Sequence, residues 1–262
     1  MPLPKDSVAL VTASSAGLGA ATAKALAASG IRVVINYHTN ASKATALLQD
    51  LQALQPSPSP SPPSSEETPR FHAIRADVSQ RASLISLVEE TVKVMGRLDV
   101  VVSNQGWTKI RDFFDLDDNV DESDWDTCFN MNVKSHLWAF HAARKYLEES
   151  EGSFITTASL AGVVPSGSSI AYSVTKAAQI HLVKSLAKIS GPRIRVNSVS
   201  PGLLLTEWGL QFPKEKVEKT TNKAVLKRTA TIEDVANQIL CLANSNSQTG
   251  TNSVIDAGFI LG

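Results

Sequence analysis

Short apolar runs alternate with helix-like segments along nearly the whole chain, and this alternation constrains the fold more than any other feature. The runs most typical of strands are residues 7–12, 31–36, 71–75, 98–102, 152–158, 193–199 and 252–256. Between most of them lie segments with apolar residues at helical spacing, at about 19–29, 41–54, 80–95, 122–149, 170–180 and 231–243. Strands that alternate with helices form a parallel, doubly wound sheet covered by helices on both faces. We therefore predict an α/β fold with a seven-stranded, mostly parallel sheet.

Length and composition indicate one soluble domain. The chain has 262 residues, 43% of them apolar and 19% charged, and its 25 basic and 25 acidic side chains give a formal net charge of zero. This balance gives no indication of a nucleic-acid or membrane partner. Cys128 and Cys241 are the only cysteines and lack metal-ligand spacing, so we expect neither a disulfide framework nor a metal site. The first residues show no signal-peptide pattern, and we expect a cytoplasmic protein.

One segment departs from the alternation. Residues 55–70 are rich in alternating Ser and Pro, a composition that neither forms a helix nor supplies a buried face. We predict a surface insertion within a single domain spanning residues 1–262. A partner-binding role is the alternative to a tolerated loop.

The first strand is followed by small residues and glycines, Ala13-Ser14-Ser15-Ala16-Gly17-Leu18-Gly19, and then by a helical stretch. This layout presents backbone N–H groups and a helix N-terminus to a phosphate, although small residues also form ordinary tight turns. The second strand ends in Asn36-Tyr37-His38-Thr39-Asn40, with Lys43 soon after and no carboxylate. Enzymes that prefer NAD place an acidic residue there, so NADP(H) is favoured over NAD(H). The alternative is a polar strand end that binds no ligand.

Tyr172 and Lys176 lie four residues apart in a segment of helical spacing, which places the phenol and the ammonium on one face. A neighbouring cation lowers the pKa of a phenol and makes the pair suitable for general acid–base catalysis. Taken alone, the spacing is more typical of a buried tyrosine and a solvated lysine than of a catalytic pair. The acid-rich segment 112–126 lacks the glycine of a calcium loop, so we expect its carboxylates to cap the next helix.

Together these stretches resemble the classical short-chain dehydrogenase/reductase family, ketoreductase-like, over essentially the whole chain. Residues 12–19 match the TGxxxGxG turn apart from Ala13, and residues 103–106 (SNQG) resemble NNAG. Asp77 matches the acidic residue that contacts adenine, residues 201–206 match PGxxxT, and residues 256–258 resemble the usual end of the last strand. Asn132, Ser159, Tyr172 and Lys176 fall on the Asn-Ser-Tyr-Lys tetrad. The resemblance implies a Rossmann fold and a homo-oligomer, a tetramer or dimer.

The resemblance also implies roles. Ser159 would bind the substrate carbonyl, Tyr172 would deliver the proton, Lys176 would bind the cofactor ribose and lower the pKa of Tyr172, and Asn132 would hold a water. Together with the nucleotide-site patterns above, it gives the predicted cofactor contacts Thr12, Ser14, Ser15, Gly17, Leu18, Gly19, Asn36, Tyr37, His38, Asp77, Val78, Asn104, Gly106, Tyr172, Lys176, Pro201, Gly202 and Thr206.

The sequence departs from the family pattern at three places. Ala13 adds a methyl group at the phosphate turn, Ala16 stands where many NADP-preferring relatives carry a basic residue, and Gln105 replaces a small residue near the expected cofactor path. These departures leave a non-catalytic nucleotide sensor or scaffold as one alternative.

Loops after the fourth, fifth and sixth strands should line the substrate pocket, with residues of about 203–226 as a lid. The predicted substrate contacts are apolar: Trp107, Val164, Leu204, Trp208 and Phe212. We therefore expect an NADP(H)-dependent oxidoreductase acting on the carbonyl or alcohol of an apolar, cyclic or aromatic small molecule. Reduction of an imine or enone, or a cyclisation in secondary metabolism, is the alternative.

Overall fold

The computed structural model describes residues 3–4, 6–54 and 68–262, and it contains one parallel sheet. The strands are β1 (Val8–Val11), β2 (Arg32–Tyr37), β3 (Phe71–Arg75), β4 (Val100–Ser103), β5 (Ser153–Thr157), β6 (Arg195–Pro201) and β7 (Asn252–Ile255). Their order across the sheet is β3-β2-β1-β4-β5-β6-β7, with every pair parallel. The predicted doubly wound fold is confirmed, and the sheet is wholly rather than mostly parallel.

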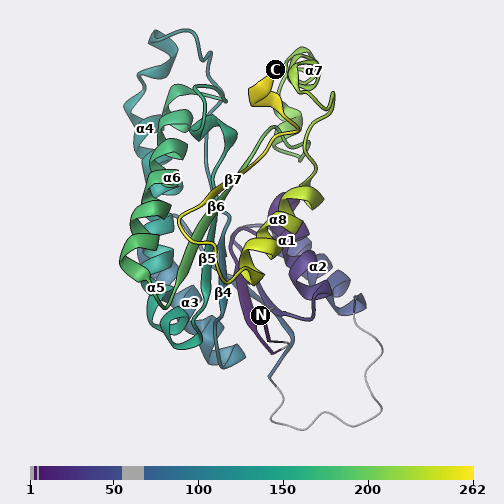
Figure 1. Cartoon of the computed structure of the whole chain (residues 1–262), viewed down its shortest axis with the longest axis vertical. Coiled ribbons are helices and arrows are strands. Elements are labelled where there is room, and N and C mark those ends of the chain that lie inside the picture. The colour runs from purple at the N-terminus through teal and green to yellow at the C-terminus, as the bar shows by residue number, and fades with distance from the viewer. Residues whose placement is uncertain (1–2, 5, 55–67) are drawn as a thin grey trace.

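Helices cover both faces of this sheet (Figure 1). One face carries α1 (Gly17–Ala28), α2 (Ala41–Ala53) and α8 (Ile232–Asn244), which enclose one apolar core. The other carries α3 (Arg81–Met95), α5 (Ser135–Ser150) and α6 (Ile170–Ser190), which enclose a second core. Helix α4 (Glu122–Phe129) precedes α5, and α7 (Lys214–Lys223) lies in the segment between β6 and α8.

The central strands show why this architecture follows from the residues. All four residues of β1 and of β4 are buried, because helices pack on both sides of them. Their side chains alternate between the two cores: Val8 and Leu10 face α3, whereas Ala9 and Val11 face α1 and α8. The continuous apolar runs of the sequence are therefore strands buried on both faces.

Helix ends follow local chemistry. Thr231 caps α8 by accepting a hydrogen bond from the Asp234 amide. Asp121 caps α4 in the same way, so the predicted capping role of the acid-rich segment is confirmed for this carboxylate. The guanidinium of Arg111 pairs with Asp118, Asp121 and Asp124 in that segment.

The predicted single helix at 122–149 is interrupted. A π-helical turn, Asn130–Lys134, separates α4 from α5. Such turns insert one extra residue per turn and are frequent at functional sites. The predicted Ser/Pro insertion falls mostly on residues 55–67, outside the described part of the chain. No described helix is long and apolar enough to cross a membrane.

Candidate active site

The turn after β1 forms a cradle for a phosphate group. Gly17 has φ +56°, a left-handed conformation that side chains disfavour. A Cβ atom on Gly19 would lie 2.7 Å from the Ala13 carbonyl oxygen, so only glycine fits at that position. Ala16 precedes α1 and supplies no side-chain acceptor to its first amides. This uncapped helix start, approached closely by backbone, fits the diphosphate of a dinucleotide.

Ala13 occupies an unusual backbone conformation. Its φ is +47°, in the left-handed region where glycine is favoured, and this is the position where the family motif has glycine. The Ala13 amide donates to Asn36 Oδ1 at 2.9 Å, and Asn104 Nδ2 donates to the Ala13 carbonyl at 3.2 Å. These two contacts hold the turn in place in spite of the added methyl group.

Three predicted cofactor residues turn their side chains inward. Ser14 Oγ donates to the Val11 carbonyl, and Asn36 Nδ2 donates to the carbonyls of Tyr37, Ile74 and Ala76. Thr12, Ser14 and Asn36 are each at most 1% exposed. These three side chains support the turn on its buried side. Its more open side is formed by Ser15, Ala16 and Gly17. The Asn36 amide is therefore used within the protein, and a contact between this residue and the cofactor stays a prediction.

Cations surround the end of β2, where the adenosine end of a dinucleotide binds in this fold. Lys43, in the first turn of α2, pairs with Glu207 of the lid at 2.6 Å. Arg75, at the end of β3, donates to the His38 carbonyl at 3.0 Å. Asp77 accepts a hydrogen bond from the Ser79 amide. Burial raises the pKa of Asp77, but the hydrogen bonds from Ser79 outweigh it and lower the pKa overall.

The predicted catalytic residues come together from neighbouring elements. Ser159 follows β5, and it lines the same cavity as Tyr172. Tyr172 lies in the first turn of α6, where Ser169 accepts from its amide and fixes the start of the helix. Lys176 Nζ lies 5.6 Å from the centroid of the Tyr172 ring. The four-residue spacing thus brings both groups to one face, as expected.

Lys176 is held by neutral acceptors. Its Nζ donates to the Thr157 carbonyl and to Gln179 Oε1, both at 2.9 Å. Burial lowers the pKa of Lys176 to about 7. Gln179, which sequence analysis missed, is fully buried and lies seven residues after Tyr172 on the same helix face. That spacing could have revealed it.

The expected lowering of the Tyr172 pKa is absent from this structure. Burial raises the pKa of the phenol, the hydrogen bond from Ser159 lowers it, and Cys128 raises it further. Lys176 is not among these causes, and its ammonium donates to Thr157 and Gln179. The sequence prediction assumed that helical proximity alone sets the direction of the ammonium.

Asn132 lies in the π-helical turn and has a positioning role. Its Oδ1 accepts from the Trp107 amide at 2.8 Å, and its Nδ2 donates to the Trp107 carbonyl and to Thr175 Oγ1. Both side-chain N–H groups are therefore used. A Cβ on Gly106 would lie 3.4 Å from both Asn132 Oδ1 and Lys176 Nζ, so this backbone passes close to both side chains. The water-holding role of Asn132 stays a prediction.

Gln105 points away from the cofactor path and into a buried polar network. Its Oε1 accepts from the hydroxyls of Thr12 and Ser103, and its Nε2 donates to Ser135 Oγ at 2.9 Å. Ser135 Oγ in turn donates to the carbonyl of Met131, inside the π-helical turn. This side chain is 2% exposed and connects the glycine turn to the turn bearing Asn132.

His136 extends the same network. Its Nδ1 lies 2.8 Å from Ser103 Oγ, while Nε2 is buried with no hydrogen-bond partner among the described residues. Burial, reinforced by Lys176, holds the pKa of His136 well below its ordinary value. The imidazole of His136 is therefore neutral, and it does not add a second cation beside Lys176.

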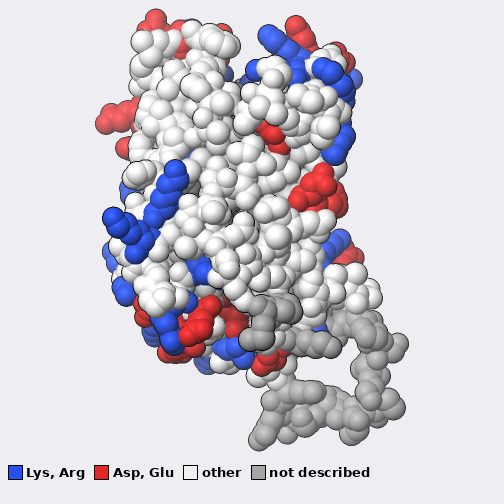
Figure 2. Space-filling view, in the orientation of Figure 1, with Lys and Arg blue, Asp and Glu red and all other residues white. Residues whose placement is uncertain are grey.

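A cavity of about 630 Å³ opens at the carboxyl ends of the strands, between the β5–α6 loop and the lid. Figure 2 shows the upper end hollowed between the α4 side and the α7 side. The lining includes predicted residues from the phosphate turn, the catalytic group and the lid: Gly17, Leu18, Asn104, Ser159, Tyr172, Pro201, Gly202, Leu204, Thr206, Trp208 and Phe212. The phosphate cradle therefore shares one space with Ser159 and Tyr172, whereas Asn132 and Lys176 lie outside this lining.

Two predicted substrate residues lie outside this lining. Trp107 is tied to Asn132 through its backbone, and Val164 belongs to a loop that turns outward at the exposed Val163. The structure adds lining residues that sequence analysis missed: Leu160, Ala161, Ser166, Gly167, Ser168, Gln211, Lys216, Thr220 and Phe259. Their positions depend on loop paths that no local pattern predicts.

Comparisons with known proteins agree with this geometry. The protein family described as enoyl-(acyl carrier protein) reductase matches residues 12–260. A protein of Streptomyces violaceoruber, named as ketoacyl reductase 2 of the granaticin polyketide synthase, is 36% identical over 97% of this chain and 96% of its own. The chain belongs to the short-chain dehydrogenase/reductase family. The 3-oxoacyl-[acyl-carrier-protein] reductase FabG of Staphylococcus aureus is 30% identical over 94% of each chain.

Solved structures of short-chain dehydrogenases share the fold. One from Burkholderia cenocepacia, solved in complex with NADP, superposes with a TM-score of 0.84 at 29% identity and covers 97% of this chain and 98% of its own. One from Serratia marcescens superposes equally well, with a TM-score of 0.84 at 28% identity and 97% coverage of both chains. This short-chain dehydrogenase/reductase is accordingly an oxidoreductase that acts on a carbonyl or alcohol.

Proposed function

We propose that this protein is an NADP(H)-dependent reductase of apolar, ring-containing ketones, or a dehydrogenase of the matching alcohols. The observation that carries the proposal is that Ser159 and Tyr172 line one cavity together with Gly17 and Leu18 of the phosphate cradle. A carbonyl oxygen placed between these two hydroxyls would accept a hydrogen bond from each.

The chain's own residues would handle the proton. Nicotinamide supplies or accepts the hydride when it is bound. Tyr172 would donate its phenolic proton to the carbonyl oxygen of a ketone, and Ser159 would orient that oxygen and stabilise its developing charge. Lys176, with a pKa of about 7, can carry or release a proton near neutral pH. Its contact with the Thr157 carbonyl fixes it behind Tyr172.

The lid supports an aromatic or cyclic substrate. Trp208 lies 6.5 Å from the Tyr172 ring, and Phe212 meets Trp208 edge to face at 5.3 Å, both between ring centroids. These flat apolar surfaces stand beside the phenol that would transfer the proton. Ring-shaped substrates bury more area there than linear ones do.

The preference for NADP(H) rests on charge around the end of β2. Lys43 and Arg75 are cations at this strand end, and the acidic residue typical of NAD-dependent enzymes is absent from residues 36–40. Lys43 is paired with an exposed carboxylate of the lid, so a 2′-phosphate would compete with Glu207 for its ammonium.

Parallel titrations with NADPH and NADH, followed by tryptophan fluorescence, test the cofactor. We expect NADPH to bind more tightly. Glu207→Gln should tighten NADPH binding a few-fold by releasing Lys43, and Lys43→Met should weaken it more than it weakens NADH binding. Tighter binding of NADH to the wild-type protein would overturn the assignment.

Product analysis with deuterated NADPH separates ketone reduction from the alternatives. Deuterium on a carbinol carbon supports the proposal, whereas deuterium beta to a retained carbonyl indicates enone reduction. The family description as an enoyl reductase makes this comparison necessary.

We also propose that the protein forms a homo-oligomer in the cytoplasm. Apolar side chains on α5 and α6 are exposed, namely Leu137, Val174 and Ile189 at 40%, 41% and 69%. Two such helices buried against a second copy would account for this exposure. Sedimentation analysis of the purified protein measures the oligomeric state.

A further inference from the structure

A single cation lies in the wall of the substrate cavity. Among the described residues that line the cavity, Lys216 of α7 is the only basic residue and Glu207 the only acidic one. The charge of Glu207 is already balanced by Lys43 at 2.6 Å. The lining therefore carries one positive charge that the cavity itself does not neutralise.

Lys216 lies close to the reacting centre. Its Nζ donates to the Gly167 carbonyl at 3.0 Å. Gly167 in turn packs against the catalytic ring, since a Cβ there would lie 3.3 Å from Tyr172 Cδ1. Gly167 thus lies between the Lys216 ammonium and the Tyr172 ring, and one small molecule can contact both.

Lys216 is an exposed residue, so its ammonium is open to solvent and to a ligand in the cavity. The ammonium stands 4.6 Å from the centroid of the Phe212 ring. Burial lowers the pKa of Lys216, while Asp112 raises it from a distance. Within the described part of the chain, Lys216 forms no ion pair, and its recorded partners are a neutral carbonyl and an aromatic ring. An ammonium has three N–H donors, so this arrangement can still bind an anion.

We propose that Lys216 binds a carboxylate of the substrate, and that the substrate class is therefore an apolar, ring-containing keto acid or hydroxy acid. This inference rests on the proposed function, because it concerns the same cavity. The ring would lie against Trp208 and Phe212, and the carboxylate would lie beside the Gly167 loop, where Ser166 and Ser168 supply further hydroxyls.

A matched pair of ligands tests the carboxylate site directly. 2-Naphthoate and 2-naphthamide share a ring system and differ in charge, and their binding to the full-length protein with NADP⁺ can be followed by tryptophan fluorescence. We expect the acid to bind about five- to tenfold more tightly than the amide, and this preference should fall with added salt. In Lys216→Met the ratio should approach one. Lys219→Met removes an exposed lysine of the same helix, outside the cavity lining, and should keep the ratio.

The outcomes distinguish this inference from the proposed function. Equal binding of acid and amide to the wild-type protein, or binding of neither, overturns the carboxylate site. An unchanged ratio in Lys216→Met does the same. Reduction of a neutral bicyclic ketone is measured in parallel: turnover without any preference for acids leaves the reductase assignment intact. A Lys216-dependent preference without turnover of ketones supports the anion site and contradicts the reductase.

Discussion

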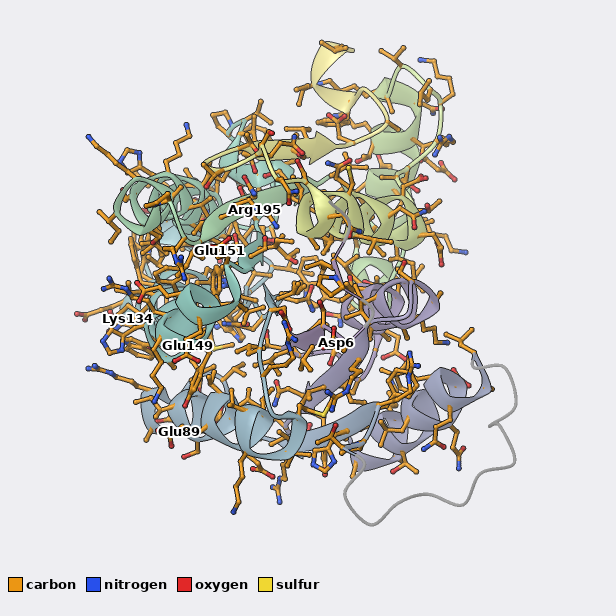
Figure 3. All side chains as sticks on the ribbon, turned by 60° about the horizontal axis from the view of Figure 1, so that its bottom comes forward. Asp6, Glu89, Lys134, Glu149, Glu151 and Arg195 are labelled. Atoms are coloured by element: carbon orange, nitrogen blue, oxygen red, sulfur yellow. The ribbon has the colours of Figure 1, made fainter. Side chains whose placement is uncertain are left out.

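Buried charged side chains have different partners at the two ends of the sheet. At the amino end, Arg97 pairs with Asp6 and with the buried Asp99, and Asp99 also accepts from the Val8 amide. Arg195 donates to the carbonyls of Leu242 and Ala243 at the end of α8, where the helix dipole favours a cation. Figure 3 turns this end forward and labels Asp6 and Arg195.

The catalytic group at the carboxyl end lacks such matching. Lys176 is 3% exposed and has only neutral acceptors, and the Nε2 atom of His136 has no partner among the described residues. A buried charge without an opposite charge and a buried nitrogen without a partner both cost stability. The difference shows that the chain pairs its buried charge at one end of the sheet. At the other end it keeps a less stable arrangement of reactive groups.

The largest effect should follow from removing the phenolic hydroxyl. Tyr172→Phe keeps the ring and its contact with Trp208 but removes the proton donor. We expect turnover to fall by roughly a thousandfold or more, with NADPH affinity nearly unchanged. Steady-state kinetics and fluorescence titration measure the two quantities. Turnover that survives in this variant would exclude Tyr172 from acid–base catalysis.

Lys176 should give a stability effect that depends on pH. Its pKa is about 7 in the folded protein, against 10.5 as the reference value for the unfolded chain. Between these values the unfolded state binds the extra proton, so the contribution of Lys176 to the free energy of unfolding rises with pH.

The comparison with Lys176→Met isolates this contribution. The free energy of unfolding of the wild type minus that of the variant should increase between pH 7 and 10, by up to about 1.4 kcal/mol per pH unit. Urea unfolding at several pH values measures it. A difference that stays constant with pH would mean that the buried ammonium keeps an ordinary pKa.

Gln105→Ala should weaken both stability and catalysis. The change leaves Thr12, Ser103 and Ser135 without the partner that joins them, at a cost of about 1–3 kcal/mol in the free energy of unfolding. Because the network reaches the turn that holds Asn132, we also expect a lower kcat. Gln52→Ala, at an exposed position of α2, is the control and should change neither quantity.

Arg97→Met should affect stability alone. It leaves the buried carboxylate of Asp99 with the Val8 amide as its remaining partner. The arginine is 39% exposed, so we expect a modest loss of about 1–2 kcal/mol. Unfolding in urea measures this loss, and kinetics under native conditions should show unchanged kcat and KM. A fall in kcat would remove the contrast between the two ends.

The sequence analysis predicted least well the direction in which polar side chains point. Asn36 and Gln105 both stand at strand ends that face the cofactor path, yet both side chains turn into the interior. Local spacing says which residues share a face, but it does not say which distant backbone groups will satisfy a polar side chain. The Asn36 amide donates to carbonyls at the end of β3, and the Gln105 amide bonds the hydroxyls of Thr12 and Ser135. These partners lie up to 93 residues away in the chain.

The sequence by itself determined the doubly wound sheet, the glycine turn, the capped start of α8 and the joint placement of Tyr172 and Lys176. All of these depend on hydrophobic period, on glycine and capping chemistry, or on spacing within one helix, which are local properties. Only the tertiary structure decided that Lys176 points to Thr157 and Gln179, that a π-helical turn interrupts the helix at Asn130, and that Lys216 faces the cavity. Those features arise where elements distant in sequence compete for the same polar groups, and no local pattern encodes the result.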